Sequence, residues 1–580
     1  MKLKNKNTIT FIIILIVSLF VAIPSIKMNI QYDDGIQHVC RLIGTERSIK
    51  EGNIFSTIIS NLCNNFGYSW NLFYSPLTAY LPLIFRIFGF SYGNCLRLFL
   101  LFCSIASGYS MYFFVKKILQ KKDIDNDKKY YIALLAASFY ICAPYRISDM
   151  YIRVAIAEVA SFIFIPIIWN GIYSIFNYKE FTSRKYVLCF GIVGLMLSHT
   201  LITFYMAIIC AIYVICNYKK IDKHVIIQLV KNILLALVIT AFYWIPLVES
   251  KLLCDYEVFN QSHMVRENVL VKLKVSLIEL IWLKDDRMAY FLEIPLLLGI
   301  MLTINIVKKK KIQDLQSYFF FLLTGIICVI LTMDFIPFEK FPSFMKMMQF
   351  SFRLFEFSSF FLSVIAAINI GLFFKEFTFA KMLIIVLVIM DLIIPISKNI
   401  DYQNGYISEN DLIQGVRVTS STGRVHAGCA SFEYLPSKAF NNRKYIEDRE
   451  DVPIAYNNQT ISNYEKNGLT MKFTMEGTGE VELPYIYYIG YCVRVNGVKV
   501  KTKESDNGFI KINVTEEKSS VTVDYEGSTL MKISLIISII SLLSIFVKKI
   551  IDLRQKKDWI FKKYIVKYCK KSCCNNANNN

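Results

Sequence analysis

An acidic pair and two basic side chains lie close together near the start of the chain. Asp33 and Asp34 follow the apolar run at residues 9–26, and Asp34, His38 and Arg41 are spaced i, i+4 and i+7. This spacing places the last three side chains on one face of a helix. A solvated helix face with balanced charges would show the same spacing.

The chemistry that these side chains suit is proton transfer next to a phosphate. A carboxylate at the edge of an apolar region can act as a general base, because partial loss of water raises its pKa toward neutral pH. His38 would orient the Asp34 base or hold a phosphate, and Arg41 would grip phosphate oxygens with its planar fork.

A second charged group borders two later apolar runs. Its members are Arg146, Asp149, Arg153 and Glu158. Charges at the border of an apolar run are expensive and tend to be paired or functional, although they also anchor helices at a membrane surface. Function and anchoring both remain open here.

Two further positions carry polar side chains at the ends of apolar runs. His199 lies between two such runs, where a lone histidine is more often an ordinary loop residue than a ligand. Arg353 enters a run with Gln349 one helical turn before it. An arginine on the outer side of a membrane is unusual, which favours a role such as phosphate binding.

The composition predicts an integral membrane protein. Of the 580 residues 54% are hydrophobic and only 19% are charged, against about 25% charged in an ordinary globular protein. Apolar runs long enough for a helical span number about 12. They are residues 9–26, 98–115, 130–145, 159–176, 185–197, 201–216, 225–248, 288–307, 318–335, 352–374, 382–396 and 530–547.

The lysines predict the orientation of these spans. The net charge is +20, and the basic residues cluster in alternate connections near residues 116–129, 179–185, 219–223, 308–311 and 375–381 and in the tail after residue 548. The positive-inside rule puts these connections and both termini on the cytoplasmic side of the membrane. The clusters then interact with anionic lipid, which argues against a nucleic-acid partner.

The spans and the connections divide the chain into six parts. A first span (residues 1–28) precedes an outer loop (29–96), a membrane bundle (97–397), an extracytoplasmic domain (398–528), a last span (529–547) and a basic cytoplasmic tail (548–580). The outer loop is expected to hold amphipathic helices at 36–48 and 54–62 and a non-spanning, re-entrant piece at 76–90.

The outer domain reads as an all-β sandwich. Alternating patterns predict strands at 469–475, 480–483, 491–495, 509–514 and 520–525, with a hairpin turn at Asn496-Gly497. Cys429 and Cys492 both lie in this domain, and a bridge between them stays open.

The acids and bases are thus expected on the outer side of the membrane, at the depth of lipid head groups. The substrate that fits is a lipid carrying a phosphate. The sequence has no P-loop, and nucleotides are not available outside the cell, so the donor lipid must itself be activated. No cofactor is expected, and a divalent metal stays open because no complete ligand set is evident.

Several segments resemble the YfhO-like family of bacterial membrane proteins, in the expected order along nearly the whole chain. The most specific is residues 144–158, Pro-Tyr-Arg-Ile-Ser-Asp-Met-Tyr-Ile-Arg-Val-Ala-Ile-Ala-Glu. The others are residues 34–41, 67–77, 198–200, 243–249, 349–353, 433–436 and 487–497. Gly35 departs from the bulky residue that the family often has after the aspartate, which loosens that helix start.

That family is similar to the GT-C class of membrane glycosyltransferases. The resemblance implies an inverting enzyme that moves a sugar from a polyprenyl-phosphate carrier to a cell-envelope polymer such as teichoic acid. Asp34 would be the catalytic acidic residue, with Asp33 as its neighbour and His38 beside it. The candidate substrate-binding residues are Arg41, Arg146, Asp149, Arg153, Glu158, His199, Glu249, Gln349 and Arg353, with the arginines at 146, 153 and 353 facing the donor phosphate.

Two other functions remain open on the sequence. A lipid or polysaccharide transporter or flippase should carry titratable groups near the bilayer midplane, whereas here they gather at the ends of the runs. A non-catalytic envelope-assembly protein would use the outer domain for binding alone.

Overall fold

The computed structural model describes most of the chain. The described residues are 3–31, 33–178, 186–259, 274–281, 294–308, 314–341, 349–394, 407–413, 417–420, 423–426, 428–429 and 432–551. The basic tail after residue 551, the lysines at 308–311 beyond Lys308, and parts of the predicted spans 288–307 and 382–396 lie outside these residues.

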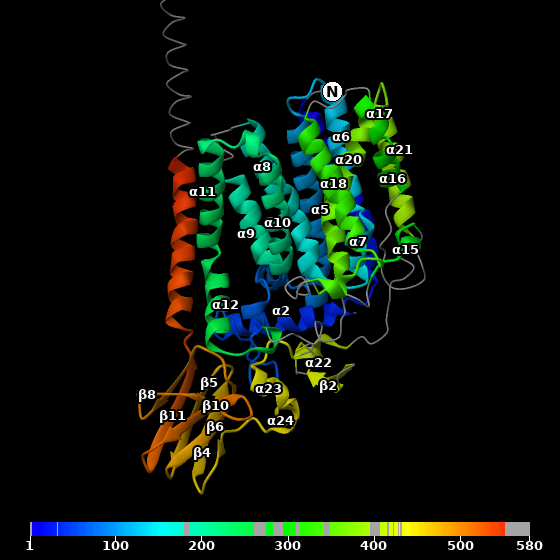
Figure 1. Ribbon diagram of the computed structural model, residues 1–580. Coiled ribbons are helices and arrows are strands. Elements are labelled where there is room, and N and C mark those ends of the chain that lie inside the picture. The colour runs from blue at the N-terminus through cyan, green and yellow to red at the C-terminus, as the bar shows by residue number, and fades with distance from the viewer. Residues whose placement is uncertain are drawn as a thin grey trace, which may run out of the picture.

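The helices form a bundle, and the strands form a separate domain below one end of it (Figure 1). The bundle helices are α1 (Leu3–Ala22), α5 (Tyr92–Leu119), α6 (Asn126–Ile141), α7 (Pro144–Tyr151), α8 (Ile156–Tyr178), α9 (Val187–Ser198), α10 (Thr200–Cys216), α11 (Lys223–Ile239), α12 (Ala241–Leu253), α15 (Leu277–Ile281), α16 (Ile294–Met301), α17 (Thr303–Lys308), α18 (Leu315–Ile330), α20 (Phe355–Phe373) and α21 (Phe379–Ile393). A final helix, Thr529–Ile551, lies beside α11 and completes the bundle.

Several of these helices are long and apolar enough to cross a membrane. In the described part of the chain five qualify, or up to seven if the bent pairs α6 with α7 and α11 with α12 are each one span. Other predicted spans correspond to shorter apolar helices, such as α9, α10 and α18. The count of about 12 therefore stays a prediction.

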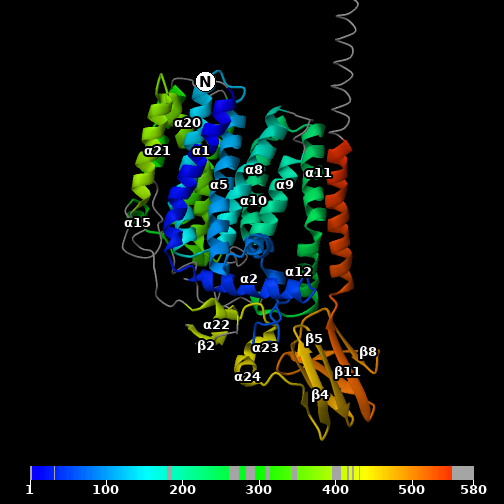
Figure 2. The ribbon, with the colours of Figure 1, turned by 180° about the vertical axis from the view of Figure 1, so that it is seen from behind.

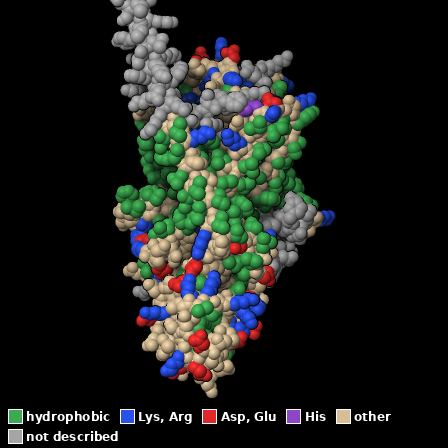
Figure 3. All heavy atoms as spheres, turned by 90° about the vertical axis from the view of Figure 1, so that its left-hand side faces the viewer, with side chains coloured by type: hydrophobic (Ala, Val, Ile, Leu, Met, Phe, Trp, Pro, Cys, Tyr) green, Lys and Arg blue, Asp and Glu red, His purple; other side chains and the backbone are tan. Residues whose placement is uncertain are grey.

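The burial of the long helices differs in a way that is typical of membrane spans. The most apolar stretch of the α20 span is completely buried at the centre of the bundle, whereas only 17% of that of the final helix is buried. A helix that is apolar all round and uncovered by protein needs hydrocarbon around it. Figure 3 shows the matching band of hydrophobic side chains over this face of the bundle.

The basic connections meet at one end of the bundle, and the strand domain lies at the other. Lys6 pairs with Asp127, and Lys128 Nζ donates to the carbonyl of Phe374 at 2.7 Å. Lys220 Nζ lies 3.7 Å from Asp314 Oδ1. The first two contacts join the start of the chain to the connections near residues 116–129 and 375–381, and the third joins the connection near 219–223 to Asp314. The described residues of these clusters therefore lie at the same end of the bundle, and the orientation of that end in a membrane stays a prediction.

Helix α2 (Asp34–Lys50) lies across the opposite end of the bundle (Figure 2). It matches the predicted helix at 36–48. A short helical piece follows later in the same loop, α4 (Leu77–Tyr80) with η2 (Pro82–Phe88). Twelve residues rise about 18 Å, which is less than the ~30 Å hydrocarbon core, as expected for a non-spanning piece.

The predicted helix at 54–62 is wrong. These residues form turns, and Ile59 pairs with Tyr68 in an isolated antiparallel bridge. The apolar side chains that suggested a helix are buried in the core of the strand domain instead. Ile58, Ile59 and Leu62 are each at most 3% exposed there.

The strand domain contains two main sheets with one shared core. One sheet has the order β3-β6-β10-β9 and the other β4-β5-β11-β7-β8. The strands are β3 (Ile454–Ala455), β4 (Thr460–Asn467), β5 (Thr470–Glu476), β6 (Gly479–Ile486), β7 (Tyr491–Val495), β8 (Val498–Val500), β9 (Lys503–Glu504), β10 (Phe509–Val514) and β11 (Lys518–Tyr525). The five predicted strands and the Asn496-Gly497 hairpin are confirmed, with Val495 opposite Val498 and φ of 50° and 82° at the turn.

The domain that the sequence predicted at residues 398–528 is not purely β-structure. Short helices α22 (Glu409–Ile413), α23 (Ser437–Asn441) and α24 (Arg443–Asp448) and a small hairpin of β1 (Arg417–Ser420) and β2 (Gly423–His426) precede the sheets. Residues of the outer loop complete the core of this domain, among them Phe66, whose ring centroid lies 5.1 Å from that of Phe509.

This shared core predicts that the outer loop stabilises the strand domain. Phe66 is completely buried, so Phe66→Ala should lower the free energy of unfolding by about 3–5 kcal/mol. Phe55 is 53% exposed, and Phe55→Ala should cost less than about 1 kcal/mol. Thermal unfolding of the two purified variants measures the difference, and equal effects would show that Phe66 is not part of the core.

Candidate functional site

Glu158 lies at the centre of a buried charged cluster. Its Oε2 accepts from Arg153 Nη1 at 3.0 Å, and its Oε1 accepts from Arg353 Nε at 2.9 Å. Glu158 begins α8, Arg153 lies in the link from α7, and Arg353 lies in η6 (Ser351–Leu354) before α20. The cluster therefore joins residues almost 200 positions apart at one end of the bundle.

Asp149 and Tyr145 complete the surroundings of Arg153. Asp149 Oδ1 accepts from Arg153 Nη1 at 2.8 Å, and the Tyr145 hydroxyl donates to Glu158 Oε2. The side-chain hydrogen bonds of Arg153 to described residues all come from Nη1. Its other nitrogens are thus available to an anion, as far as the described residues show.

The two predicted polar neighbours, His199 and Gln349, also reach the cluster. His199 Nδ1 accepts from the backbone N–H of Ile202 at 3.4 Å and caps α10. This bond leaves the ring proton on Nε2, which lies 3.9 Å from Glu158 Oε1. Gln349 Oε1 accepts from Arg353 Nη1 at 2.7 Å.

The start of α2 is tied directly to this cluster. The backbone N–H of Asp34 donates to the carbonyl of Arg153 at 3.1 Å. Gly35 permits the contact, because a Cβ there would lie 1.9 Å from the carbonyl oxygen of Ile30 and 3.2 Å from Val154 Cβ. Gly35 thus allows a close approach of two backbones.

Backbone strain is concentrated around the same contact. Asp33, Val154 and Gln349 have φ of 48°, 52° and 64°, a region that costs non-glycine residues about 1–3 kcal/mol each. Val154 is β-branched, for which a positive φ is exceptional. Strain of this kind persists only where the surrounding contacts enforce it, and it is common at functional sites.

Asp34 has a mixed electrostatic environment. Burial raises the pKa of its carboxyl group above the ordinary 3.8, the charge of Arg153 opposes the rise, Glu158 adds to it and Arg353 opposes it. The carboxylate of Asp34 is half-buried. A carboxylate with a raised pKa, whose charge is also stabilised by two arginines, suits proton removal from a group that reacts close to an anion.

His38 is buried one turn further along α2. Burial, helped by the charge of Arg41, lowers the pKa of His38 to about 3, so the ring is neutral at physiological pH. Its edge faces the ring of Tyr74 at a centroid distance of 5.7 Å. Neither ring nitrogen has a hydrogen-bond partner among the described residues, so a neutral donor and a neutral acceptor are available here.

The guanidinium group of Arg41 is hydrogen-bonded to other groups of the protein. Its guanidinium donates to Asn71 Oδ1, to Thr78 Oγ1 and to the carbonyls of Tyr74 and Ser75, at 2.9–3.1 Å. Burial lowers the pKa of Arg41 to about 10, which leaves it charged at neutral pH. These bonds fix residues 71–78 against α2, so the arrangement suits a positioning role for Arg41 rather than contact with a phosphate.

Three predicted residues lie outside the cluster. Asp33 is exposed at the start of α2. Arg146 is buried inside the bundle and donates to Ser104 Oγ at 2.9 Å and to the carbonyl of Ile141 at 3.2 Å. Glu249 accepts from Ser528 at the start of the final helix.

Sequence reasoning missed Tyr145, Tyr74 and Glu356 as members of the site. Glu356 is buried at the start of α20 and accepts from Ser161. A carboxylate one turn after Arg353 inside an apolar run was a usable signal for Glu356. The tyrosines carried no comparable signal, because the chain contains 35 of them.

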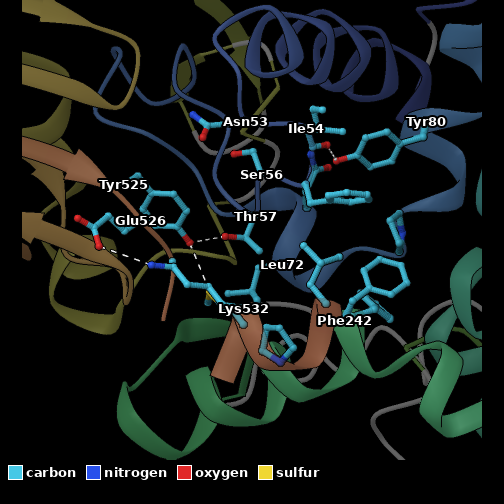
Figure 4. Close-up of a pocket in the computed structure, with 18 of the residues that line it drawn as sticks. Asn53, Ile54, Ser56, Thr57, Leu72, Tyr80, Phe242, Tyr525, Glu526 and Lys532 are labelled. Carbon is cyan, nitrogen blue, oxygen red and sulfur yellow. Dashed lines mark hydrogen bonds and ion pairs between the residues drawn. The ribbon is translucent and has the colours of Figure 1, made fainter. Parts of the chain in front are cut away.

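A cavity of about 400 Å³ lies between the outer loop, α12 and the strand domain (Figure 4). Residues 52–57, Tyr80, α12, the end of β11 and the start of the final helix line it. The Tyr80 hydroxyl donates to the carbonyl of Ile54 at 2.8 Å, and Thr57 contacts the Tyr525 hydroxyl. Asn71 lines the cavity and also accepts from Arg41, so Arg41 connects the cavity wall to α2.

Comparisons with known proteins add little to this geometry. No family model matches the chain, and no solved structure matches it. An uncharacterized protein of Lactococcus lactis subsp. cremoris (strain MG1363) is similar, with 26% identity over 266 residues. The match covers 45% of this chain and 42% of that protein. Within the described residues, no three His, Cys, Asp or Glu side chains are grouped as metal ligands.

The central position of Glu158 predicts a large effect of its removal. Glu158→Gln leaves two buried arginines short of a charge partner, so the free energy of unfolding should fall by about 3–5 kcal/mol. Glu476→Gln is the matched control, because the pair with Lys518 is exposed and its loss should cost less than about 1 kcal/mol. Thermal unfolding in detergent compares them, and a Glu158→Gln effect as small as the control would contradict the cluster.

Proposed function

We propose that the protein is a membrane glycosyltransferase, which moves a sugar from a polyprenyl-phosphate carrier to a cell-envelope polymer on the outer face of a bacterial membrane. The observation that carries the proposal is the half-buried Asp34, whose backbone N–H donates to the carbonyl of Arg153 at the end of the bundle that faces the strand domain. The resemblance to the YfhO-like family supplies the class of substrate.

The orientation in the membrane is supported by the distribution of charge. The positive-inside rule assigns the lysine-rich end of the bundle to the cytoplasm. The charged cluster, α2 and the strand domain then lie outside. The exposed Ile87 and Phe88 of η2, at 81% and 73% exposure, would insert into the surface of the bilayer beside this end.

The chemical step is written with Asp34 as the base. Its carboxylate takes the proton of an acceptor hydroxyl, and that oxygen attacks the anomeric carbon of the donor. The bond from that carbon to the phosphate oxygen breaks, and the polyprenyl phosphate leaves with the bonding electrons. Arg153 and Arg353 stabilise the charge that develops on the leaving phosphate, as preorganised cations do in a water-poor site.

The surrounding parts provide room for the two substrates. The α4 and η2 piece would form a wall along which the lipid tail enters. The strand domain and the cavity beside Arg41 would receive the polymeric acceptor, because the cavity joins that domain to the α2 face.

The first test removes the proposed base. Asp34→Asn keeps the size of the side chain and should lower sugar transfer by about 10²–10⁴-fold, the usual contribution of a general base. Asp33→Asn is the control, since the Asp33 side chain is exposed, and it should retain most activity. Membrane fractions with radiolabelled polyprenyl-phosphate sugars provide the assay. An unchanged rate of sugar transfer in Asp34→Asn, at equal protein abundance, would contradict the assignment of Asp34 as the general base.

The second test measures kcat/KM as a function of pH and follows its decrease on the acidic side, called the acidic limb. Transfer requires ionised Asp34, so kcat/KM should fall as the pH drops through the raised pKa of Asp34. Arg353 lowers that pKa, so Arg353→Gln should raise it and move the limb to higher pH. Arg47→Gln, at the exposed far end of α2, should leave the limb in place. A limb that stays unmoved in Arg353→Gln contradicts Asp34 as the titrating group.

A further inference from the structure

Two buried cysteines are in contact where the outer loop enters the strand domain. Cys63 and Cys429 are 1% and 0% exposed, and their Sγ atoms lie 3.4 Å apart. They are 366 positions apart in the chain. Cys40 of α2 lies beside them, because a Cβ added to Gly428 would be 2.7 Å from Cys40 Cβ.

The backbone on both sides holds this pair in place. Cys63, Asn64 and Asn65 all have positive φ, between 52° and 64°, a conformation that isolated residues seldom keep. The Cys63 carbonyl accepts from the N–H of Phe66 at 3.0 Å, and Asn64 Nδ2 donates to the carbonyl of Ile446 at 2.6 Å. The strained turn is therefore docked on the strand domain.

The partner of Cys429 differs from the one considered in the sequence. Cys492 lies on β7, where it faces Asp524 of β11 in the sheet register, whereas the sulfur in contact with Cys429 is that of Cys63. A covalent bond between Cys63 and Cys429 needs an approach of only about 1.4 Å from the present separation, given an S–S bond of about 2.05 Å.

We propose that Cys63 and Cys429 form a disulfide that fastens the outer loop to the strand domain. The inference rests on the outward orientation of the proposed function, since disulfides persist on the cell surface and not in the cytoplasm. The bond forms by exchange with an oxidised dithiol of the thiol-oxidoreductase class. Each cysteine loses its S–H bond, one S–S bond forms, and the oxidant takes up two electrons and two protons and becomes a dithiol.

The burial of the thiols indicates when the bond forms. Burial and the neighbouring Cys429 raise the pKa of Cys63, and burial likewise raises the pKa of Cys40. Exchange requires a thiolate, which is scarce at Cys63 once this residue is buried. Both sulfurs are buried in the folded protein, so the disulfide would be shielded from reductants in solution.

The disulfide would also limit the movement of the candidate functional site. Residues 58–70 precede Asn71, Tyr74 and Ser75, which bind Arg41 of α2. A covalent link at Cys63 limits the movement of this segment and, through Arg41, of the helix that carries Asp34 and His38.

The test is a thiol map of the full-length protein in membranes. Cells are quenched with acid, and the protein is denatured without reductant, alkylated with N-ethylmaleimide and digested for mass spectrometry. Peptides of Cys63 and Cys429 should appear as one linked species that dithiothreitol releases after denaturation but not in native membranes. Recovery of both cysteines as maleimide adducts, or a link of Cys429 to Cys40 or Cys492, overturns the proposal.

Variants that lack one cysteine test the same disulfide independently. In Cys63→Ser, Cys429 should become alkylated and the unfolding temperature should fall on the order of 5–10 °C. Cys40→Ser is the matched control and should leave the link between Cys63 and Cys429 intact; its loss in that control overturns the proposal. Free thiols at 63 and 429 would overturn the disulfide but not the transferase, which depends on the separate result with Asp34→Asn.

Discussion

The placement of one carboxylate between two arginines organises this end of the molecule. Glu158 is almost completely buried and bonded to both Arg153 and Arg353. Burying charge is expensive unless the partners and their hydrogen bonds are complete, so α7, α8 and α20 must meet in a narrow range of positions. The strained link at Val154 lies inside this arrangement, and the start of α2 is bonded to it through Asp34. The position of the proposed base thus follows from the ion pairs.

The strand domain is bound to the same site by the chain itself. Residues 58–70 leave α2, add their side chains to the core of the strand domain and return to the bundle beside Arg41. A domain that shares its core with the outer loop cannot move freely relative to α2. This gives the domain a structural role in addition to any part in binding an acceptor.

The periodic parts of the structure could be predicted from sequence, and the connections between them could not. The alternation along β5, β6, β7, β10 and β11 and the Asn496-Gly497 turn depend on local spacing, and so does α2. The charges at the ends of apolar runs pointed to Arg153, Glu158 and Arg353, because burial of charge needs partners. The helix prediction at residues 54–62 failed, since the apolar side chains of this segment belong to a core formed mainly by residues more than 360 positions away. Arg41 and Arg146 looked like the cluster arginines in sequence, and only the packing shows that they donate to other groups, Arg41 to Asn71 and Arg146 to Ser104.

The most direct test asks on which side of the membrane the charged end of the bundle lies. Lys499 in the strand domain and Lys219 in a lysine-rich connection are both exposed, and each can be replaced by cysteine and compared with the unsubstituted protein. An impermeant maleimide should label Lys499→Cys in intact cells and Lys219→Cys only after permeabilisation. The opposite pattern would put Asp34 on the cytoplasmic side and contradict a lipid-linked sugar as the donor.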